Sequence, residues 1–155
     1  MQALAITRNG DPFEIIDIEE PEVKEKTEVK IKIHGTAICG GEVYRYKNPP
    51  KKLKTSPRII GHEYSGIVVE KGSNVKSVDI GDKVIAESSA GCEECIYCRT
   101  GYTNLCPYRK GISGSLTDYI VVPDRYIYKL PENVSLDLAT LSEPLACVIN
   151  GFEKT

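Results

Sequence analysis

Four of the six cysteines fall within one fifteen-residue segment, and this segment constrains the possible fold more than any other feature. Separated by two, two and seven residues, they are Cys92, Cys95, Cys98 and Cys106. Four thiolates at such short spacings can surround one zinc ion in a closed tetrahedral site. Disulfides are disfavoured because neighbouring CxxC pairs would form strained bridges. A closed site of this kind stabilises structure and leaves no open coordination position for chemistry.

The composition indicates an ordinary globular domain in a reducing compartment. The chain has 155 residues, 41% of them hydrophobic and 27% charged, which is enough for a real core. No apolar run is long enough to cross a membrane, and the first residues lack the pattern of a signal peptide. We therefore expect a cytoplasmic protein, in which clustered cysteines bind metal. The net charge of -2 argues against nucleic-acid binding, which needs a basic face.

The hydrophobic pattern predicts short strands over most of the chain and helices near its end. The clearest strand is 28–33, where Val29, Ile31 and Ile33 alternate with polar residues that are expected to face outward. Ser135 can cap a helix, and Pro144 either interrupts that helix or opens a second one. Further strands are expected at 1–7, 13–18, 58–72, 83–86, 116–122 and 126–129, a helical turn at 42–46, a turn at 9–12 and a surface loop at 48–57. This order predicts a mainly β fold, a partly open β-barrel with a C-terminal helical segment.

A second group of candidate metal ligands consists of Cys39, His62 and Glu143. His62 interrupts the apolar run 58–72, where a polar side chain needs a partner. Cys39 precedes two glycines that allow close approach, and Glu143 is a carboxylate in apolar surroundings. One sulfur, one nitrogen and one oxygen ligand with an open fourth position is the arrangement of a catalytic zinc. The plainer interpretation is that Cys39 is a small buried thiol, His62 a core histidine with a hydrogen-bond partner, and Glu143 a glutamate at a helix start. The spacing of the three residues does not decide between this interpretation and a zinc site.

Five motifs in order resemble the N-terminal catalytic domain of zinc-dependent medium-chain dehydrogenases, the superfamily of alcohol, polyol (sorbitol-type) and threonine dehydrogenases. They lie at 39–42, 61–66, 75–84, 92–106 and 142–146, and the likeness runs along the whole chain. The four-cysteine loop separates the chain from the zinc-free quinone reductases of the same superfamily. The resemblance implies one domain, 1–155, with a GroES-like β-barrel and a lobe loop of about 88–112 around the structural zinc.

The resemblance also implies the catalytic site. Cys39 and His62 are expected to bind the catalytic zinc, with Glu143 as the third ligand where alcohol dehydrogenases have a cysteine. Glu63 is expected close to the metal, where it could exchange with the bound water or with Glu143. The implied reaction is oxidation of an alcohol, polyol or sugar hydroxyl to a carbonyl, with hydride transfer to NAD(P). The zinc would assist by stabilising the alkoxide, and the enzyme is expected to be a homo-oligomer.

Two departures and one absence bear on this expectation. Gly41 stands where family members commonly carry a serine or threonine that begins a proton relay, and Tyr44 lies where many have a histidine. The proton is therefore expected to leave through water, Tyr44 or Glu42. No GxGxxG fingerprint occurs, so we expect the catalytic part of a longer enzyme, inactive without a Rossmann domain. The alternative is a non-enzymatic zinc-binding GroES-like scaffold module, which would need only the four-cysteine metal.

Overall fold

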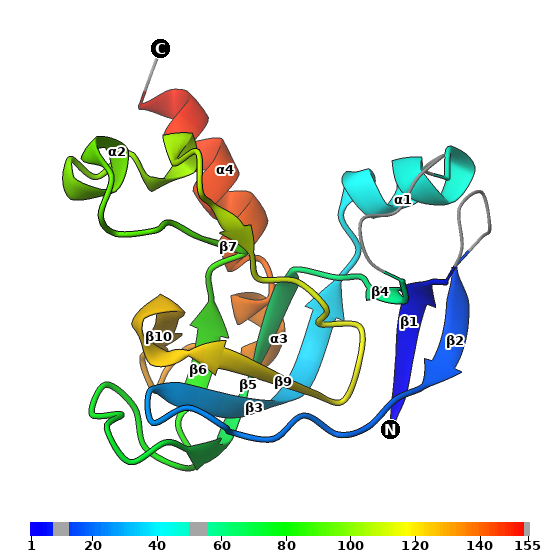
Figure 1. Cartoon of the computed structure of the whole chain (residues 1–155), viewed down its shortest axis with the longest axis horizontal. Helices are drawn as coiled ribbons and strands as arrows, with labels where there is room; N and C mark the ends of the chain where they lie inside the picture. Colours follow the sequence, from blue (N-terminus) through cyan, green and yellow to red (C-terminus); the bar gives the residue numbers. More distant parts are fainter. Residues whose placement is uncertain (8–12, 50–55, 154–155) are drawn as a thin grey trace.

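The computed structural model describes residues 1–7, 13–49 and 56–153, and antiparallel strands form its body (Figure 1). The strands are β1 (Gln2–Ile6), β2 (Glu14–Asp17), β3 (Glu28–Ala37), β4 (Arg58–Ile59), β5 (Glu63–Lys71), β6 (Lys83–Ala86), β7 (Ser89–Ala90), β8 (Lys110–Gly111), β9 (Tyr119–Pro123) and β10 (Ile127–Lys129). The helices are α1 (Gly40–Lys47), α2 (Ile96–Arg99), α3 (Leu136–Ala139) and α4 (Ser142–Phe152), with 3₁₀ turns η1 (Thr103–Leu105) and η2 (Asp124–Tyr126). The expected turn at 9–12 and most of the expected loop at 48–57 lie outside the described residues.

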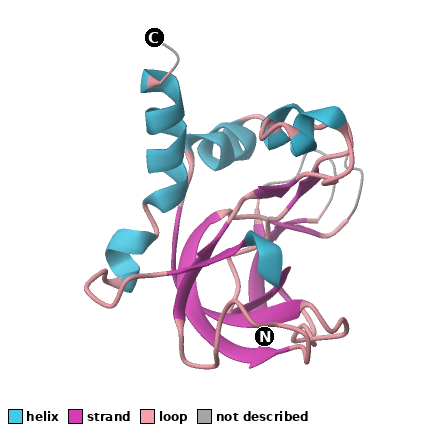
Figure 2. Ribbon diagram, turned by 90° about the vertical axis from the view of Figure 1, so that its left-hand side faces the viewer, coloured by secondary structure: helices cyan, strands magenta, loops and turns pink. Residues whose placement is uncertain are grey.

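Two sheets and one small strand pair organise the strands. The larger sheet has the order β10-β6-β5-β3-β9, and the smaller one has the order β2-β1-β4. The pair β7–β8 joins Ser89 to Gly111, so the segment with the four cysteines leaves and re-enters the body at one place. Figure 2 shows the strands of the body curving strongly, and the antiparallel sheets confirm the expected mainly β, partly open barrel.

The core lies against the larger sheet and follows the alternation of β3. Val29 and Ile31 are fully buried, and β9 brings Val122 opposite Val29. The prediction that Lys30 faces outward was wrong, because its side chain is buried beside Glu20 and over the ring of Tyr119. The hydrogen bond to Glu20 raises the pKa of Lys30 and keeps its charge paired.

The expected strand 58–72 is divided into β4 and β5 by a turn at Gly61. Gly61 has φ +95°, a conformation that L side chains rarely adopt. A Cβ at this position would lie 2.6 Å from the Ser115 hydroxyl and 2.8 Å from the Leu116 backbone nitrogen. Only glycine fits here, and the turn places His62 at the entrance of β5.

The helical segment near the end of the chain begins with two defined signals. The Ser135 hydroxyl accepts a hydrogen bond from the Leu138 backbone N–H at 3.2 Å, which confirms the predicted cap. Pro144 lies in the first turn of α4, where a missing N–H is tolerated, so it opens a second helix. Within the described ranges, no helix is long and apolar enough to cross a bilayer.

Candidate metal centres

The four cysteines of the lobe converge on one point. The sulfur atoms of Cys92, Cys95, Cys98 and Cys106 all lie within 4.8 Å of one another. The Cys95 and Cys98 sulfurs are 3.6 Å apart, close to the ~3.8 Å that a tetrahedron with Zn–S bonds of about 2.3 Å requires. The side chains therefore fit the closed structural zinc site predicted from their spacing.

Backbone donors support this cysteine cluster. The Cys95 backbone N–H donates to the Cys92 sulfur, and the Cys92 N–H donates to the Cys106 sulfur, both at 3.4 Å. Hydrogen bonds from the backbone of Cys95 and Glu94 lower the pKa of Cys92 to about 7, whereas burial raises the pKa of Cys98 to about 12. A divalent cation among the sulfurs would offset the cost of the half-buried Cys98 thiolate.

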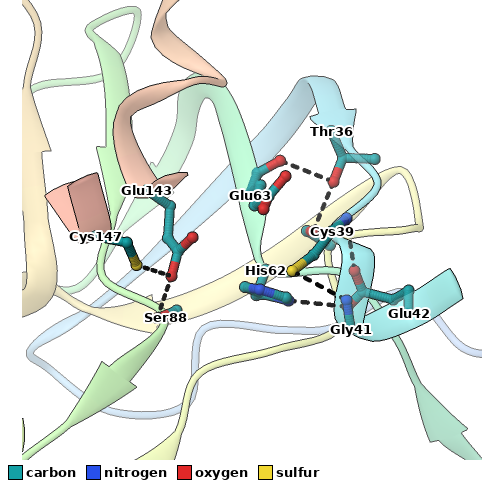
Figure 3. A network of polar contacts seen from close by, with 10 residues as sticks. Thr36, Cys39, Gly41, Glu42, His62, Glu63, Ser88, Glu143 and Cys147 are labelled. Carbon is teal, nitrogen blue, oxygen red and sulfur yellow. Dashed lines mark hydrogen bonds and ion pairs between the residues drawn. The ribbon is translucent and has the colours of Figure 1, made fainter. Parts of the chain in front are cut away.

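The second cluster consists of Cys39, His62 and Glu63, whose ligand atoms also lie within 4.8 Å of one another (Figure 3). The pairing of β3 with β5 explains this convergence. Ala37 pairs with Glu63, so Cys39, two residues after Ala37, meets His62, one residue before Glu63. The Thr36 hydroxyl donates to the Glu63 carbonyl at 3.0 Å and fixes the start of β5. One sulfur, one nitrogen and one oxygen donor form a set that suits zinc.

The carboxylate of Glu42 contacts both Cys39 and His62. Glu42 is 2% exposed, and one of its carboxylate oxygens accepts the Cys39 backbone N–H at 2.9 Å. The other oxygen lies 2.9 Å from Nδ1 of His62. A neutral His62 then carries its proton on Nδ1 and presents the lone pair of Nε2 to a metal. Sequence reasoning considered Glu42 only as a proton route and missed this role, although its spacing from Cys39 is that of a capping box.

The helix that follows Cys39 also holds its sulfur. Cys39 is the N-cap of α1, and its sulfur accepts the Gly41 backbone N–H at 3.4 Å. Gly41 has no hydroxyl to begin a proton relay, but its backbone N–H helps to fix the position of the Cys39 sulfur.

Glu143 lies outside this three-residue cluster. Its carboxylate accepts a hydrogen bond from the Ser88 hydroxyl at 3.3 Å, and the Cys147 sulfur is 3.9 Å from the same oxygen. In the view of Figure 3, Glu143 and Cys39 lie on opposite sides of His62 and Glu63. Glu63 thus occupies the place beside Cys39 and His62, and the role of Glu143 as third ligand stays a prediction.

A pocket adjoins the second cluster. It has a volume of about 460 Å³, and His62 and Glu143 are both part of its lining. The hydroxyls of Ser88, Ser89 and Ser113 add polar groups to the wall. A small hydroxylated molecule has room there next to His62.

Comparison with known proteins agrees with the fold. The family described as "Alcohol dehydrogenase GroES-like domain" matches residues 25–132. D-arabitol-phosphate dehydrogenase of Enterococcus avium is 41% identical over 147 residues, which cover 92% of this chain and 41% of that protein. Sorbitol dehydrogenase of Halalkalibacterium halodurans is 33% identical over 160 residues, which cover 100% of this chain and 46% of that protein.

A solved structure gives the same result in three dimensions. Galactitol-1-phosphate dehydrogenase from Escherichia coli superposes with a TM-score of 0.88 at 26% identity, covering 99% of this chain and 44% of that one. The chain thus spans less than half the length of these relatives. The family match includes Cys39, His62, Glu63 and all four lobe cysteines. The chain belongs to the alcohol dehydrogenase GroES-like domain family, the N-terminal domain of the zinc-dependent medium-chain dehydrogenases.

Proposed function

We propose that the chain is the zinc-binding catalytic domain of an NAD(P)-dependent dehydrogenase that oxidises a hydroxyl of a polyol or related alcohol to a carbonyl. The observation that carries the proposal is the convergence of Cys39, His62 and Glu63, with Glu42 orienting the histidine. A non-enzymatic scaffold would need the lobe cysteines but no second cluster. The relatives named above are dehydrogenases, which also favours the enzyme.

The donor set of the second cluster suits a catalytic zinc in charge and in geometry. A Cys39 thiolate and a Glu63 carboxylate together balance a divalent cation, and neutral His62 adds a third donor without charge. When bound, zinc supplies a Lewis acid that makes a substrate hydroxyl easier to deprotonate. The Gly41 N–H holds the Cys39 sulfur, and Glu42 keeps Nε2 of His62 free of a proton.

Two carboxylates can serve as the oxygen ligand. Glu63 is buried and lies beside Cys39 and His62, so we assign the third position to it. Glu143 faces the pocket beyond His62 and is proposed as the exchanging carboxylate. The hydride acceptor is proposed to be NAD(P), and no residue of this chain is assigned to it. A homo-oligomeric assembly stays a prediction.

Metal analysis tests the proposal. The chain purified under reducing conditions is expected to hold two zinc ions, and Cys39→Ala is expected to hold one. Cys95→Ser is the matched control at the other cluster, and it is expected to lose the structural zinc and destabilise the lobe. A wild-type chain with one zinc, and the same content in Cys39→Ala, would refute the catalytic-site proposal and favour the scaffold.

A further inference from the structure

Three arginines surround the pocket that contains His62. Arg45 comes from α1, Arg58 from β4, and Arg109 from the stretch just before β8. The three side chains are exposed and therefore accessible to a ligand that enters the pocket. Segments far apart in the sequence thus bring three permanent positive charges to one opening.

These charges have little compensation from the protein. Within the described ranges, the side chains of Arg45 and Arg58 have no ion-pair or hydrogen-bond partner, and the side chain of Arg109 donates only to the Asn104 carbonyl at 3.2 Å. The acids in the pocket lining, Glu42 and Glu143, are engaged with His62 and Ser88 instead.

Some cations elsewhere on the surface do have acidic partners. Lys71 pairs with Asp79, and Lys129 pairs with Asp82, both at 2.7 Å. Three like charges around one opening repel one another unless an anion joins them. The pocket opening thus brings together three arginines whose side chains have no acidic partner among the described residues.

We propose that Arg45, Arg58 and Arg109 form a subsite for a phosphate group of the substrate, so that the substrate class is a phosphorylated polyol. This inference rests on the proposed function, because the subsite is defined relative to the reacting hydroxyl at His62. A phosphate monoester carries a charge of about −1.5 to −2, and the guanidinium fork binds its oxygens in a bidentate manner. A carboxylate carries only one negative charge, so three guanidinium groups suit it less well.

The distance between the arginines and His62 is short enough for one ligand to contact both ends of the pocket. Arg58 precedes His62 by four positions in the chain, so their Cα atoms lie at most about 14 Å apart. Arg45 follows Glu42 by three residues on α1, which places both on one helix face. The phosphate would occupy the arginine end while a hydroxyl of the same molecule lies near His62.

Binding measurements on the full zinc-loaded chain test the subsite. The probes are sorbitol, sorbitol 6-phosphate and gluconate, each titrated calorimetrically. We expect the phosphate ester to bind at least about tenfold more tightly than sorbitol and gluconate, with a preference that weakens as salt is raised. Arg58→Gln is expected to reduce the affinity for the phosphate ester about tenfold and to leave the affinity for sorbitol unchanged.

Arg99→Gln is the matched control, because Arg99 is an exposed arginine of α2 that does not line the pocket. It removes the same charge and is expected to leave all three affinities unchanged. Equal affinities for sorbitol and its phosphate, equal affinities for gluconate and the phosphate, or no binding of any probe would overturn the subsite. An equal loss in Arg99→Gln and Arg58→Gln would overturn it as well.

Zinc content separates this outcome from a failure of the proposed function. A chain with two zinc ions and no phosphate preference refutes the subsite and leaves the catalytic zinc in place. A chain with one zinc ion, unchanged in Cys39→Ala, refutes the catalytic zinc itself, whichever probe binds.

Discussion

Replacing Glu42 by glutamine tests how the second cluster is built. Both carboxylate oxygens are in use, each at 2.9 Å, one for the Cys39 backbone N–H and one for Nδ1 of His62. Glutamine keeps one acceptor and turns the other oxygen into an NH₂ donor. If the oxygen stays on the Cys39 N–H, the NH₂ group faces Nδ1. His62 must then carry its proton on Nε2, the atom needed for a metal.

The expected loss of zinc affinity follows from the typical effect of hydrogen bonds that support a metal-binding histidine. Loss of a hydrogen bond to a metal-binding histidine lowers metal affinity about 10- to 100-fold. This range corresponds to about 1.4–2.7 kcal/mol of binding free energy. We therefore expect Glu42→Gln to bind the second zinc 10- to 100-fold more weakly and the lobe zinc normally.

Competition with a chromophoric zinc chelator measures both affinities in one titration. Glu132→Gln is the control, since Glu132 is an exposed acid in the turn after β10 and touches neither cluster. Thermal unfolding of the metal-free proteins separates the metal effect from any change in the capping box, which glutamine can also complete and whose loss would cost about 1 kcal/mol. Wild-type affinity for the second zinc in Glu42→Gln would refute the role of Glu42.

Three further predictions concern stability. Gly61→Ala should destabilise the chain by at least about 2 kcal/mol in chemical denaturation, because backbone strain adds to the clash with Ser115 and Leu116. Gly81→Ala is the control, because Gly81 has a similar φ but open space around it, and it should cost less. Equal losses in the two variants would contradict the steric argument. Tyr64→Phe should be neutral or stabilise by up to about 1 kcal/mol, since the Tyr64 hydroxyl is buried without a partner among the described residues; a loss above 1 kcal/mol would reveal a partner. The hydrogen bond from Lys129 lowers the pKa of Asp82 below its usual value of 3.8, so the ionised Asp82 contributes fully to folding stability above that pH and loses this contribution as the pH falls through the folded-state pKa. Asp82→Asn should therefore show a smaller drop in melting temperature than the unsubstituted chain between about pH 4 and pH 2. A drop equal to that of the unsubstituted chain would contradict this prediction.

The lobe site could be predicted from the sequence because its ligands are close in the chain. Cys92, Cys95 and Cys98 are separated by two residues each, so local spacing alone brings their sulfurs together. The second cluster is different, since Cys39 and His62 are 23 residues apart. Their contact depends on the register of β3 and β5, which the residues alone did not reveal and which only the family resemblance anticipated.

Other features depended on packing that a pattern does not contain. The alternation of β3 was correct for Val29 and Ile31, but Lys30 is buried because Glu20 compensates its charge. The turn at Gly61 comes from the close approach of residues 115–116, more than 50 residues away. Strand pairing also explains why Glu63, and not Glu143, lies beside Cys39 and His62.

Anomalous diffraction at the zinc edge from a crystal of the zinc-loaded chain tests the second metal centre most directly. We predict two peaks per chain, one among the four lobe sulfurs and one between the Cys39 sulfur, the His62 ring and the Glu63 carboxylate. A single peak at the lobe cysteines, with Cys39 and His62 left without metal, would contradict the account.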